Sequence, residues 1–484
     1  MWINKQWTSH RRWPFLLIAL ALILALSLGA TGALAQGGLG VNGPCYPLVL
    51  PATAKDTMSI VWWDAPEIES GNVRYGTDQS LSDASVVAAG QTRSDGDNYT
   101  AWTATLTGLE TGATYYYQVG QGNSWSAVHS FTVANDSETD FDFLYFGDAQ
   151  YNEYTTKDSD YAAWGQLVNT AVAANPQAEL AVLGGDMVQQ GQQAASWQLF
   201  LSNATAFAGL PVLTVPGNHE SNAVNGKPAM YLDLFTLPDN GPAGFEEEFY
   251  SIDRGDCHIQ FLSSNILSNE QLLKGGMTAE DFTVIKNWIA ADLAASDATW
   301  KIVVMHHPAY AVTSDSVSAA VLEQWVPLFE EAQVDLVLCG HQHVYMRTKA
   351  LHGVTYVMGV SGAKYYAPAE VNFDEVQIGY VSNYQLISTN SGSLTMTAYN
   401  SQGTEIDRVT LAPKDRTVIP VWHDTPGDLN ADDVVDEADV EVLLTAIRCN
   451  AAYADDYDIN NDGAVDIRDA QLLALQVAGG TGND

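Results

Sequence analysis

The sequence predicts a multidomain protein in which a β-sandwich precedes an α/β domain and a small helical module follows. Short alternating apolar runs separated by turn residues fill residues 45–134. Apolar runs alternate with amphipathic helical patterns over residues 139–412, and an acidic repeat with a 30-residue period occupies residues 426–484. A chain of 484 residues is also too long for one ordinary core, so several domains are expected.

Residues 1–35 have the pattern of an export signal. Lys5, Arg11 and Arg12 precede the apolar run FLLIALALILALSLGA, and the small residues ending at Ala35 offer a cleavage site. We therefore expect a secreted protein. An uncleaved segment would instead serve as a membrane anchor, because the apolar run approaches the length that spans a bilayer.

The chain is strongly acidic. Only 20 Lys and Arg residues accompany 58 Asp and Glu residues, so the formal net charge is −38. A nucleic-acid duplex is disfavoured as a partner, because no basic surface is available to follow its phosphates. The cysteines are too few and too scattered for a disulfide framework, although one bridge stays open among Cys45, Cys257, Cys339 and Cys449.

The alternating runs of residues 45–134 are typical of an all-β sandwich. Within them LTGLETGATYYYQVG, residues 106–120, resembles the tyrosine-bearing corner of fibronectin type III-like domains. We expect Trp62, Tyr115 and Tyr117 to be core aromatics without a ligand role.

The central region alternates strand-like and helical patterns, which indicates an α/β domain. The strand patterns cover residues 141–148, 178–186, 210–218, 301–307 and 334–341. The helical patterns cover residues 160–174, 194–208, 279–295 and 316–332. Further antiparallel strands are expected at residues 354–362, 384–390 and 393–400.

Each of the five central strands ends in a potential metal ligand. Because the carboxyl ends of strands line the functional crevice of an open α/β sheet, these residues should converge. Carboxylate, amide oxygen and imidazole ligands together suit Zn, Mn or Fe. The predicted ligands are Asp148, Asp186, Asn218, His306, His341 and His343. No site role is assigned to His129, His258, His352 and His423.

The ordered series D, GD, GNHE, HHP and GHxH resembles the calcineurin-like metallophosphoesterases. With the sandwich in front, the chain from about 45 to 412 is most similar to the purple acid phosphatase branch. The resemblance implies a four-layer α/β sandwich and a two-metal site bridged by Asp186. It assigns one metal to Asp148, Asp186 and His343, and the other to Asp186, Asn218, His306 and His341.

The resemblance also implies a reaction on phosphate esters. A hydroxide held between two cations attacks phosphorus, and His219 is placed to protonate the departing alkoxide. His307 and Glu220 either help to bind the substrate or support the ligands from behind.

Two positions depart from the family pattern. Purple acid phosphatases carry a tyrosine three residues after the second aspartate, where this chain has Gln189. Other metallophosphoesterases use a histidine two residues after the first aspartate, where this chain has Gln150. Some members have glutamine there, so we expect the side-chain oxygen of Gln150 to complete the shell of the first metal.

After a linker at residues 413–425, residues 426–484 contain two EF-hand-like loops, each followed by a helical pattern. Hard oxygen ligands at these offsets bind Ca²⁺. The ligand positions are Asp428, Asn430, Asp432, Asp436 and Asp439 in the first loop, and Asp458, Asn460, Asp462, Asp466 and Asp469 in the second. Paired loop–helix units resemble a dockerin, which implies a cohesin-bearing scaffold protein as partner.

The favoured function is a secreted binuclear phosphatase of phosphate monoesters, tethered through its dockerin. Within the enzymes, a phosphodiesterase or nucleotide hydrolase stays open, because it would use the same metals. From a different class, the chain is a binding protein whose degenerate metal domain serves as scaffold. Gln150 and Gln189 keep that alternative open.

Overall fold

The structure is a computed structural model. It describes residues 39–96, 98–135, 139–221, 227–268, 277–313, 315–416, 435, 437–449, 459 and 467–480. The expected export signal therefore lies outside the described residues. Among the helices of the described part, none has the length and apolar character needed to cross a membrane. Cys45, Cys257 and Cys339 carry free thiols.

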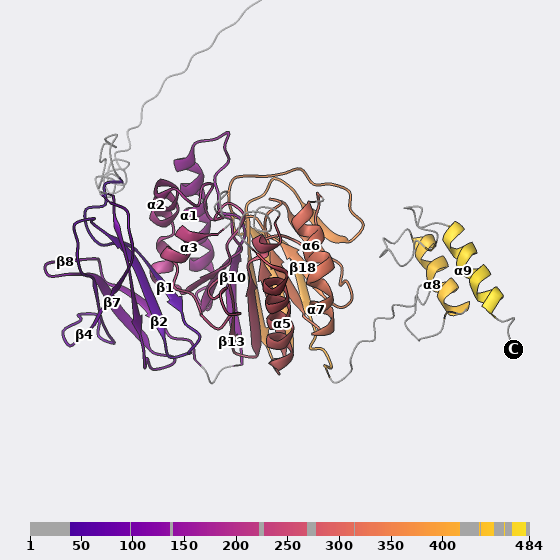
Figure 1. Cartoon of the computed structure of the whole chain (residues 1–484), viewed down its shortest axis with the longest axis horizontal. Helices are drawn as coiled ribbons and strands as arrows, with labels where there is room; N and C mark the ends of the chain where they lie inside the picture. Colours follow the sequence, from indigo (N-terminus) through magenta and orange to yellow (C-terminus); the bar gives the residue numbers. More distant parts are fainter. Residues whose placement is uncertain are drawn as a thin grey trace, which may run out of the picture. The chain divides into compact units, whose positions relative to one another are not determined.

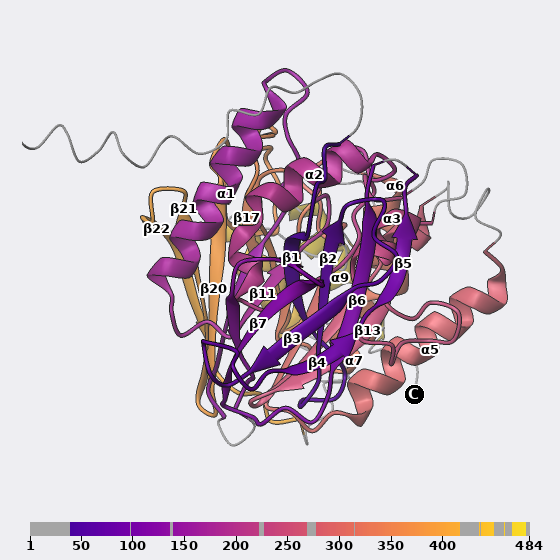
Figure 2. The same cartoon turned by 90° about the vertical axis from the view of Figure 1, so that its left-hand side faces the viewer.

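The N-terminal domain consists of two antiparallel sheets, as predicted (Figure 2). One sheet has the strand order β1 (Cys45–Pro51), β2 (Met58–Asp64), β6 (Thr100–Leu106), β5 (Gly90–Ser94). The other has the order β4 (Ser85–Ala88), β3 (Asn72–Gly76), β7 (Thr114–Gln121), β8 (Ser124–Trp125), with β9 (His129–Thr132) paired to β7.

Aromatic residues fill the space between these sheets. Trp62 and Tyr117 are fully buried in one apolar cluster, and Tyr115 packs against it from a partly exposed position. The Tyr115 hydroxyl accepts the backbone N–H of Glu110 at 3.0 Å, which is the local bond of a tyrosine corner. The Tyr117 hydroxyl donates to the Ala208 carbonyl at 2.8 Å and so ties the sandwich to the central domain.

Two sheets form the centre of the α/β domain. The first has the order β12 (Val212–Thr214), β11 (Leu180–Leu183), β10 (Phe141–Phe146), β20 (Asn383–Asn390), β21 (Ser393–Asn400), β22 (Glu405–Leu411). The second has the order β13 (Phe249–Arg254), β14 (Cys257–Leu262), β15 (Trp300–Met305), β16 (Leu336–Cys339), β18 (Thr355–Met358), β17 (Tyr345–Thr348), β19 (Asp374–Ile378). Strands β10, β11 and β12 are parallel, and so are β14, β15, β16 and β18.

The domain has the expected four layers, with helices outside the two sheets (Figure 1). Ile302 and Val304 of β15 belong to a core shared with the first sheet, whereas Val303 and Met305 belong to a core with the outer helices. Burial of both strand faces explains the continuous apolar run. The helices are α1 (Lys157–Ala174), α2 (Ala194–Asn203), α3 (Ala229–Leu234), α5 (Ala279–Ala295), α6 (Ser316–Gln324) and α7 (Val326–Glu331).

The structure corrects three expectations. The helical pattern of residues 316–332 is split at Trp325, because Pro327 cannot sit inside a helix without clashing with the preceding turn. The pattern of residues 194–208 ends as α2 at Asn203, and a short 3₁₀ helix follows. Strand β18 lies between β16 and β17 and runs parallel to β16, not only antiparallel to its neighbours.

The described C-terminal elements are α8 (Glu437–Cys449) and α9 (Ile467–Gly480). Leu443 of α8 is buried with Ala470 and Leu473 of α9 in one small core. Asp439 and Asp469, which close the two predicted calcium loops, are both fully buried. The other eight predicted calcium ligands lie outside the described residues.

His258 is a buried histidine that carries a positive charge, and the sequence around it does not distinguish it from an ordinary core histidine. Its Nδ1 atom lies 2.9 Å from Oδ1 of Asp253 on β13, and its Nε2 atom lies 3.1 Å from Oδ2 of Asp292 on α5. Burial by itself lowers the pKa of His258, but the two carboxylates raise it to about 9.

The raised pKa of His258 predicts a pH-dependent contribution to stability. A histidine with a folded-state pKa of about 9 contributes fully below its unfolded value of 6.5, and this contribution is lost as the pH rises through 9. We expect His258→Gln to lower the free energy of unfolding by roughly 1–3 kcal/mol at pH 6 and by much less at pH 10. Urea unfolding at both pH values measures this, with His352→Gln as the exposed control. An equal loss at both pH values would contradict the ion-pair assignment.

Candidate metal centre

The predicted ligands converge where the carboxyl ends of strands from both sheets meet. The first sheet contributes the residues after β10, β11 and β12, and the second contributes those after β15 and β16. All six side chains take part in one connected set of short contacts: Asp148, Asp186, Asn218, His306, His341 and His343.

Asp186 lies at the centre of this set. Its Oδ2 atom is 3.4 Å from Nε2 of His306 and accepts from the Gln150 amide at 2.8 Å. Its Oδ1 atom accepts the backbone N–H of His219 at 2.9 Å. The carboxylate is therefore shared between two groups of predicted ligands, as a bridging ligand requires.

His306, Asn218 and His341 form one side of the site. The Asn218 Oδ1 atom lies 3.2 Å from Nε2 of His306 and 3.0 Å from Nδ1 of His341. The Nδ1 atom of His306 donates to the Gly184 carbonyl at 2.8 Å, because a carbonyl can only accept. This bond directs the Nε2 lone pair of His306 into the site.

Asp148, Gln150 and His343 form the other side. The Nε2 atom of His343 lies 4.0 Å from Oδ1 of Asp148 and 3.3 Å from the Gln150 amide nitrogen. The backbone N–H of His341 donates to both oxygens of Asp148, at 3.0 and 2.9 Å. Gln150 thus lies beside the predicted ligands, but the atom that contacts them is its amide nitrogen and not the oxygen that the sequence predicts as a ligand of the first metal.

Burial and the neighbouring charges together set the protonation of these groups. Burial raises the pKa of Asp148 to about 7, helped by repulsion from Asp186 and opposed by His306. Burial also opposes ionisation of Asp186, but His306 and His219 place the pKa of that carboxyl well below its usual range. Burial lowers the pKa of His341 to about 4. A neutral imidazole is the form that binds metal.

Three predicted ligands have a left-handed backbone, which is rare for residues other than glycine. The φ angles are 48° for Asp186, 74° for His341 and 51° for His343. Each such residue costs about 1–3 kcal/mol and persists only where its surroundings impose it. Neighbouring glycines permit the close approach, since a Cβ on Gly217 would lie 2.2 Å from the Asp186 carboxylate.

Glu220 supports the loop that carries Asp186. It is fully buried, and its carboxylate accepts the backbone N–H groups of Asp186, Val188 and Gly217 at 2.8, 3.1 and 2.7 Å. Both oxygens are used by backbone donors, so the geometry favours the supporting role over substrate binding. Burial raises the pKa of Glu220 to about 8, helped by the charge of Asp186 and opposed by the bonds from Val188 and Gly217.

The donor set fits transition-metal ions. Ligand atoms of Asp148, Asp186 and His306 lie within 4.8 Å of one another, as do those of His306, His307 and His341. The Oε1 atom of Gln150 is buried, and no described residue donates to it. A buried carbonyl without a partner costs about 1–3 kcal/mol, which a cation at this position would offset.

His219 and Gln189 lie beside the ligands. The Nδ1 atom of His219 donates to the Gln189 carbonyl at 2.8 Å, and its Nε2 atom lies 3.9 Å from Oδ2 of Asp186. The His219 side chain is 23% exposed, so it reaches the mouth of the site. The Gln189 side chain turns away and donates to Glu153 at 2.9 Å.

Sequence reasoning missed the contribution of β14. Ser264, which follows this strand, lies 2.9 Å from Nδ1 of His307 and also accepts the His307 backbone N–H. Asn265 donates to the carbonyls of Pro216 and Gly217 at 3.0 and 2.7 Å. His307 is buried against His341 at a ring distance of 4.3 Å, so it lies among the ligands rather than on an open surface.

Asp315 is a second residue that the sequence did not indicate. Its carboxylate caps α6 by accepting the N–H groups of Val317 and Ser318 at 2.9 and 2.8 Å. The same carboxylate lies 3.6 Å from Nε2 of His341, the ring atom that points away from Asn218. Asp315 is therefore placed to orient a predicted ligand through its charge.

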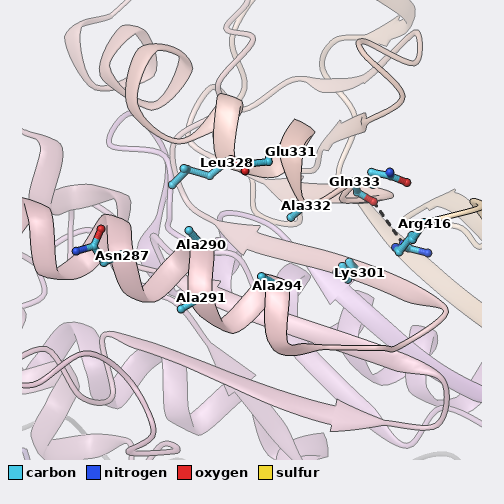
Figure 3. A pocket seen from close by; sticks show the side chains of 10 residues that line it. All are labelled: Asn287, Ala290, Ala291, Ala294, Lys301, Leu328, Glu331, Ala332, Gln333 and Arg416. Carbon is cyan, nitrogen blue, oxygen red and sulfur yellow. Dashed lines mark hydrogen bonds between the residues drawn. The ribbon is translucent and has the colours of Figure 1, made fainter. Parts of the chain in front are cut away.

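A separate cavity of about 600 Å³ lies between α5 and α7 (Figure 3). Lys301 and Arg416 line it, but the Lys301 ammonium already donates to the Leu293 carbonyl at 2.7 Å. Lys301 lies at the start of β15, whereas His306 follows its end. The cavity therefore opens at the opposite ends of the strands and contributes nothing to the metal centre.

The fold and the site are similar to those of calcineurin-like phosphoesterases, and the sheet domain in front is similar to that of purple acid phosphatases. Residues 141–345 match the calcineurin-like phosphoesterase family, and residues 46–133 match the purple acid phosphatase N-terminal domain. The structure of a purple acid phosphatase from yellow lupin seeds shares this fold, with a TM-score of 0.62 and 17% identity over 78% of this chain and 75% of that one.

Curated relatives are distant in sequence. An uncharacterized protein of Mycobacterium tuberculosis is 24% identical over 67% of this chain and 64% of its own length. A phosphoenolpyruvate phosphatase of Allium cepa is 27% identical over 61% of this chain and 60% of its own length. The chain thus spans less than two thirds of the length of either relative.

We expect Asp186→Asn to abolish the two-metal centre, because the amide removes one of the two shared carboxylate oxygens. Metal analysis after reconstitution should give fewer than two transition-metal ions per chain, and any ester hydrolysis should fall by at least about 100-fold. Asp158→Asn, on the exposed first turn of α1, is the control. Full metal content with near-normal turnover would refute the bridging position of Asp186.

We expect two substitutions of Asp315 to separate its role as a helix cap from its role in orienting His341. Asp315→Asn retains a good helix cap but loses the charge beside His341, so metal affinity should fall about 10-fold while the melting temperature changes little. Asp315→Ala should also cost about 1 kcal/mol of stability. Metal titration and thermal unfolding of both variants test this, and wild-type affinity in Asp315→Asn would exclude the orienting role.

Proposed function

We propose that the chain is a secreted two-metal phosphatase that hydrolyses phosphate monoesters and is tethered through a C-terminal dockerin. The observation that carries the proposal is the convergence of six predicted ligand side chains, Asp186 at their centre, from five strand ends in two sheets. A degenerate scaffold would have no reason to retain three strained ligands on left-handed backbone.

The residues of the chain have distinct tasks in this proposal. Asp148, Asp186 and His343 would hold one metal ion, with Gln150 beside them, and Asn218, His306 and His341 would hold the other with Asp186. When bound, such ions polarise the phosphoryl group and activate water. The Nδ1–H of His219 is anchored on a carbonyl, so in the doubly protonated imidazolium the proton on Nε2 is the one that would pass to the leaving alkoxide, which leaves the ring neutral.

The relatives support the same reaction class. The named Allium cepa protein is a phosphatase, and an acid phosphatase type 7 of Danio rerio is 25% identical over 54% of this chain. Transfer of this activity to the present chain is part of the proposal. Gln189 supplies no phenolate, so an iron-loaded protein should lack the purple charge-transfer band.

The C-terminal segment, residues 426–484, supports the proposed tethering to a scaffold. Asp439 and Asp469 are 30 residues apart, equally buried, and lie in the first turns of two helices that share a core. We propose two Ca²⁺ sites here and a cohesin-bearing scaffold as partner. Arg416 donates to the Thr299 carbonyl at 2.6 Å and pairs with Asp335, so the described chain leaves the central domain at the strand starts, away from the metal centre.

The enzymatic proposal is tested with two esters. The protein, reconstituted with Mn²⁺, Zn²⁺ or iron, should release p-nitrophenol from p-nitrophenyl phosphate faster than from bis-p-nitrophenyl phosphate. Turnover of the diester alone would favour the phosphodiesterase alternative. No turnover of either ester, across metals and pH, would leave the binding-protein alternative.

The proposed dockerin is tested by measuring Ca²⁺ binding. We expect the full chain to bind two Ca²⁺ ions by calorimetry, and Asp469→Asn to remove one of them, because position 12 supplies a charged oxygen ligand. Asp484→Asn, outside both loops, is the control. A wild-type protein that takes up no Ca²⁺ would rule out the dockerin interpretation.

A further inference from the structure

A loop that follows β18 is attached to both sides of the first-metal position. The N–H of Gly362 donates to the Asp148 carbonyl at 2.7 Å, and the N–H of Tyr366 donates to the His343 carbonyl at 3.3 Å. A Cβ on Gly362 would lie 2.7 Å from the Asp148 carbonyl oxygen, so the loop packs tightly there. Residues 362–366 are therefore held in register with two predicted ligands.

Two side chains of this loop lie beside the metal centre. The Tyr366 ring is 47% exposed and packs edge-on against the His343 ring, with the centroids 4.8 Å apart. The Lys364 ammonium lies 5.7 Å from the Tyr366 centroid. In the described part of the chain, no carboxylate lies within 4.0 Å of this ammonium to neutralise it.

The charge of Lys364 reaches the metal centre. Burial raises the pKa of Asp148, and Lys364 acts against this rise. Burial lowers the pKa of His343, and Lys364 lowers it further. The position is notable in a chain with 20 Lys and Arg residues against 58 acids, because a half-buried cation without a carboxylate partner is available for a ligand anion.

We propose that Lys364, held over Tyr366, recognises the second negative charge of a phosphate monoester. This inference rests on the proposed function and specifies its substrate class. A monoester carries two negative charges near neutral pH and a diester carries one, so a fixed cation attracts the monoester about twice as strongly. Tyr366 keeps the ammonium in place by a cation–π contact and presents its open face beside the ester's organic group.

The experiment compares charge variants of the metal-reconstituted full chain. Lys364→Gln should lower kcat/KM for p-nitrophenyl phosphate about 10-fold and for bis-p-nitrophenyl phosphate less than about 3-fold. Lys364→Arg should stay within about 3-fold of wild type for both esters. Lys349→Gln, on an exposed lysine after β17, controls for the change in net charge. Calorimetric binding of inorganic phosphate should weaken about 10-fold in Lys364→Gln alone.

The outcomes separate this inference from the proposed function. If wild type hydrolyses monoesters but Lys364→Gln changes both esters equally or neither, Lys364 is not the recognition residue and the phosphatase proposal stands. If wild type hydrolyses neither ester, the phosphatase proposal fails. In that case the binding of inorganic phosphate tests the role of Lys364. Weaker binding in Lys364→Gln than in wild type supports anion recognition by Lys364, whereas equal binding in the two proteins, or no binding in either, overturns it.

Discussion

Two carboxylates buried side by side are the constraint on which the central domain depends. Asp148 and Asp186 are withdrawn from water at the meeting point of two sheets, and the charge of Asp186 makes ionisation of Asp148 less favourable. A protein interior does not retain such a pair without compensating charge. The imidazoles around them, His306 above all, supply part of this compensation, and cations between the ligands would supply the remainder.

The loops around these carboxylates are built to withstand strain. Asp186, His341 and His343 adopt a conformation that costs free energy, and fixed partners hold each turn in place. Glu220 accepts three backbone donors around Asp186, and Asp148 accepts the N–H of His341. Asp148 is thus both a predicted metal ligand and a structural support. A substitution of Asp148 would therefore change metal binding and local folding together.

Much of the fold was predictable because strand patterns and chemical residues coincide. Each of the five predicted central strands ends within four residues of a potential ligand, and both the apolar runs and their polar ends are visible in one chain. Strands β13 and β14 were missed, because β14 is followed by Ser264 and Asn265, whose polar side chains carry no metal-ligand signal. In the sequence Asp315 has the pattern of an ordinary helix cap, and only its distance to His341 in the structure indicates a second role.

The sequence by itself predicted that a sheet domain precedes an α/β domain and that polar residues of ligand type follow its central strands, since these features follow from local periodicity and side-chain chemistry. Only the tertiary structure decided that the ligands come from two sheets rather than one, that Glu220 serves the backbone, and that Lys364 lies beside His343. The physical reason is that such proximity arises from packing between segments far apart in the chain. Local patterns do not encode those distances.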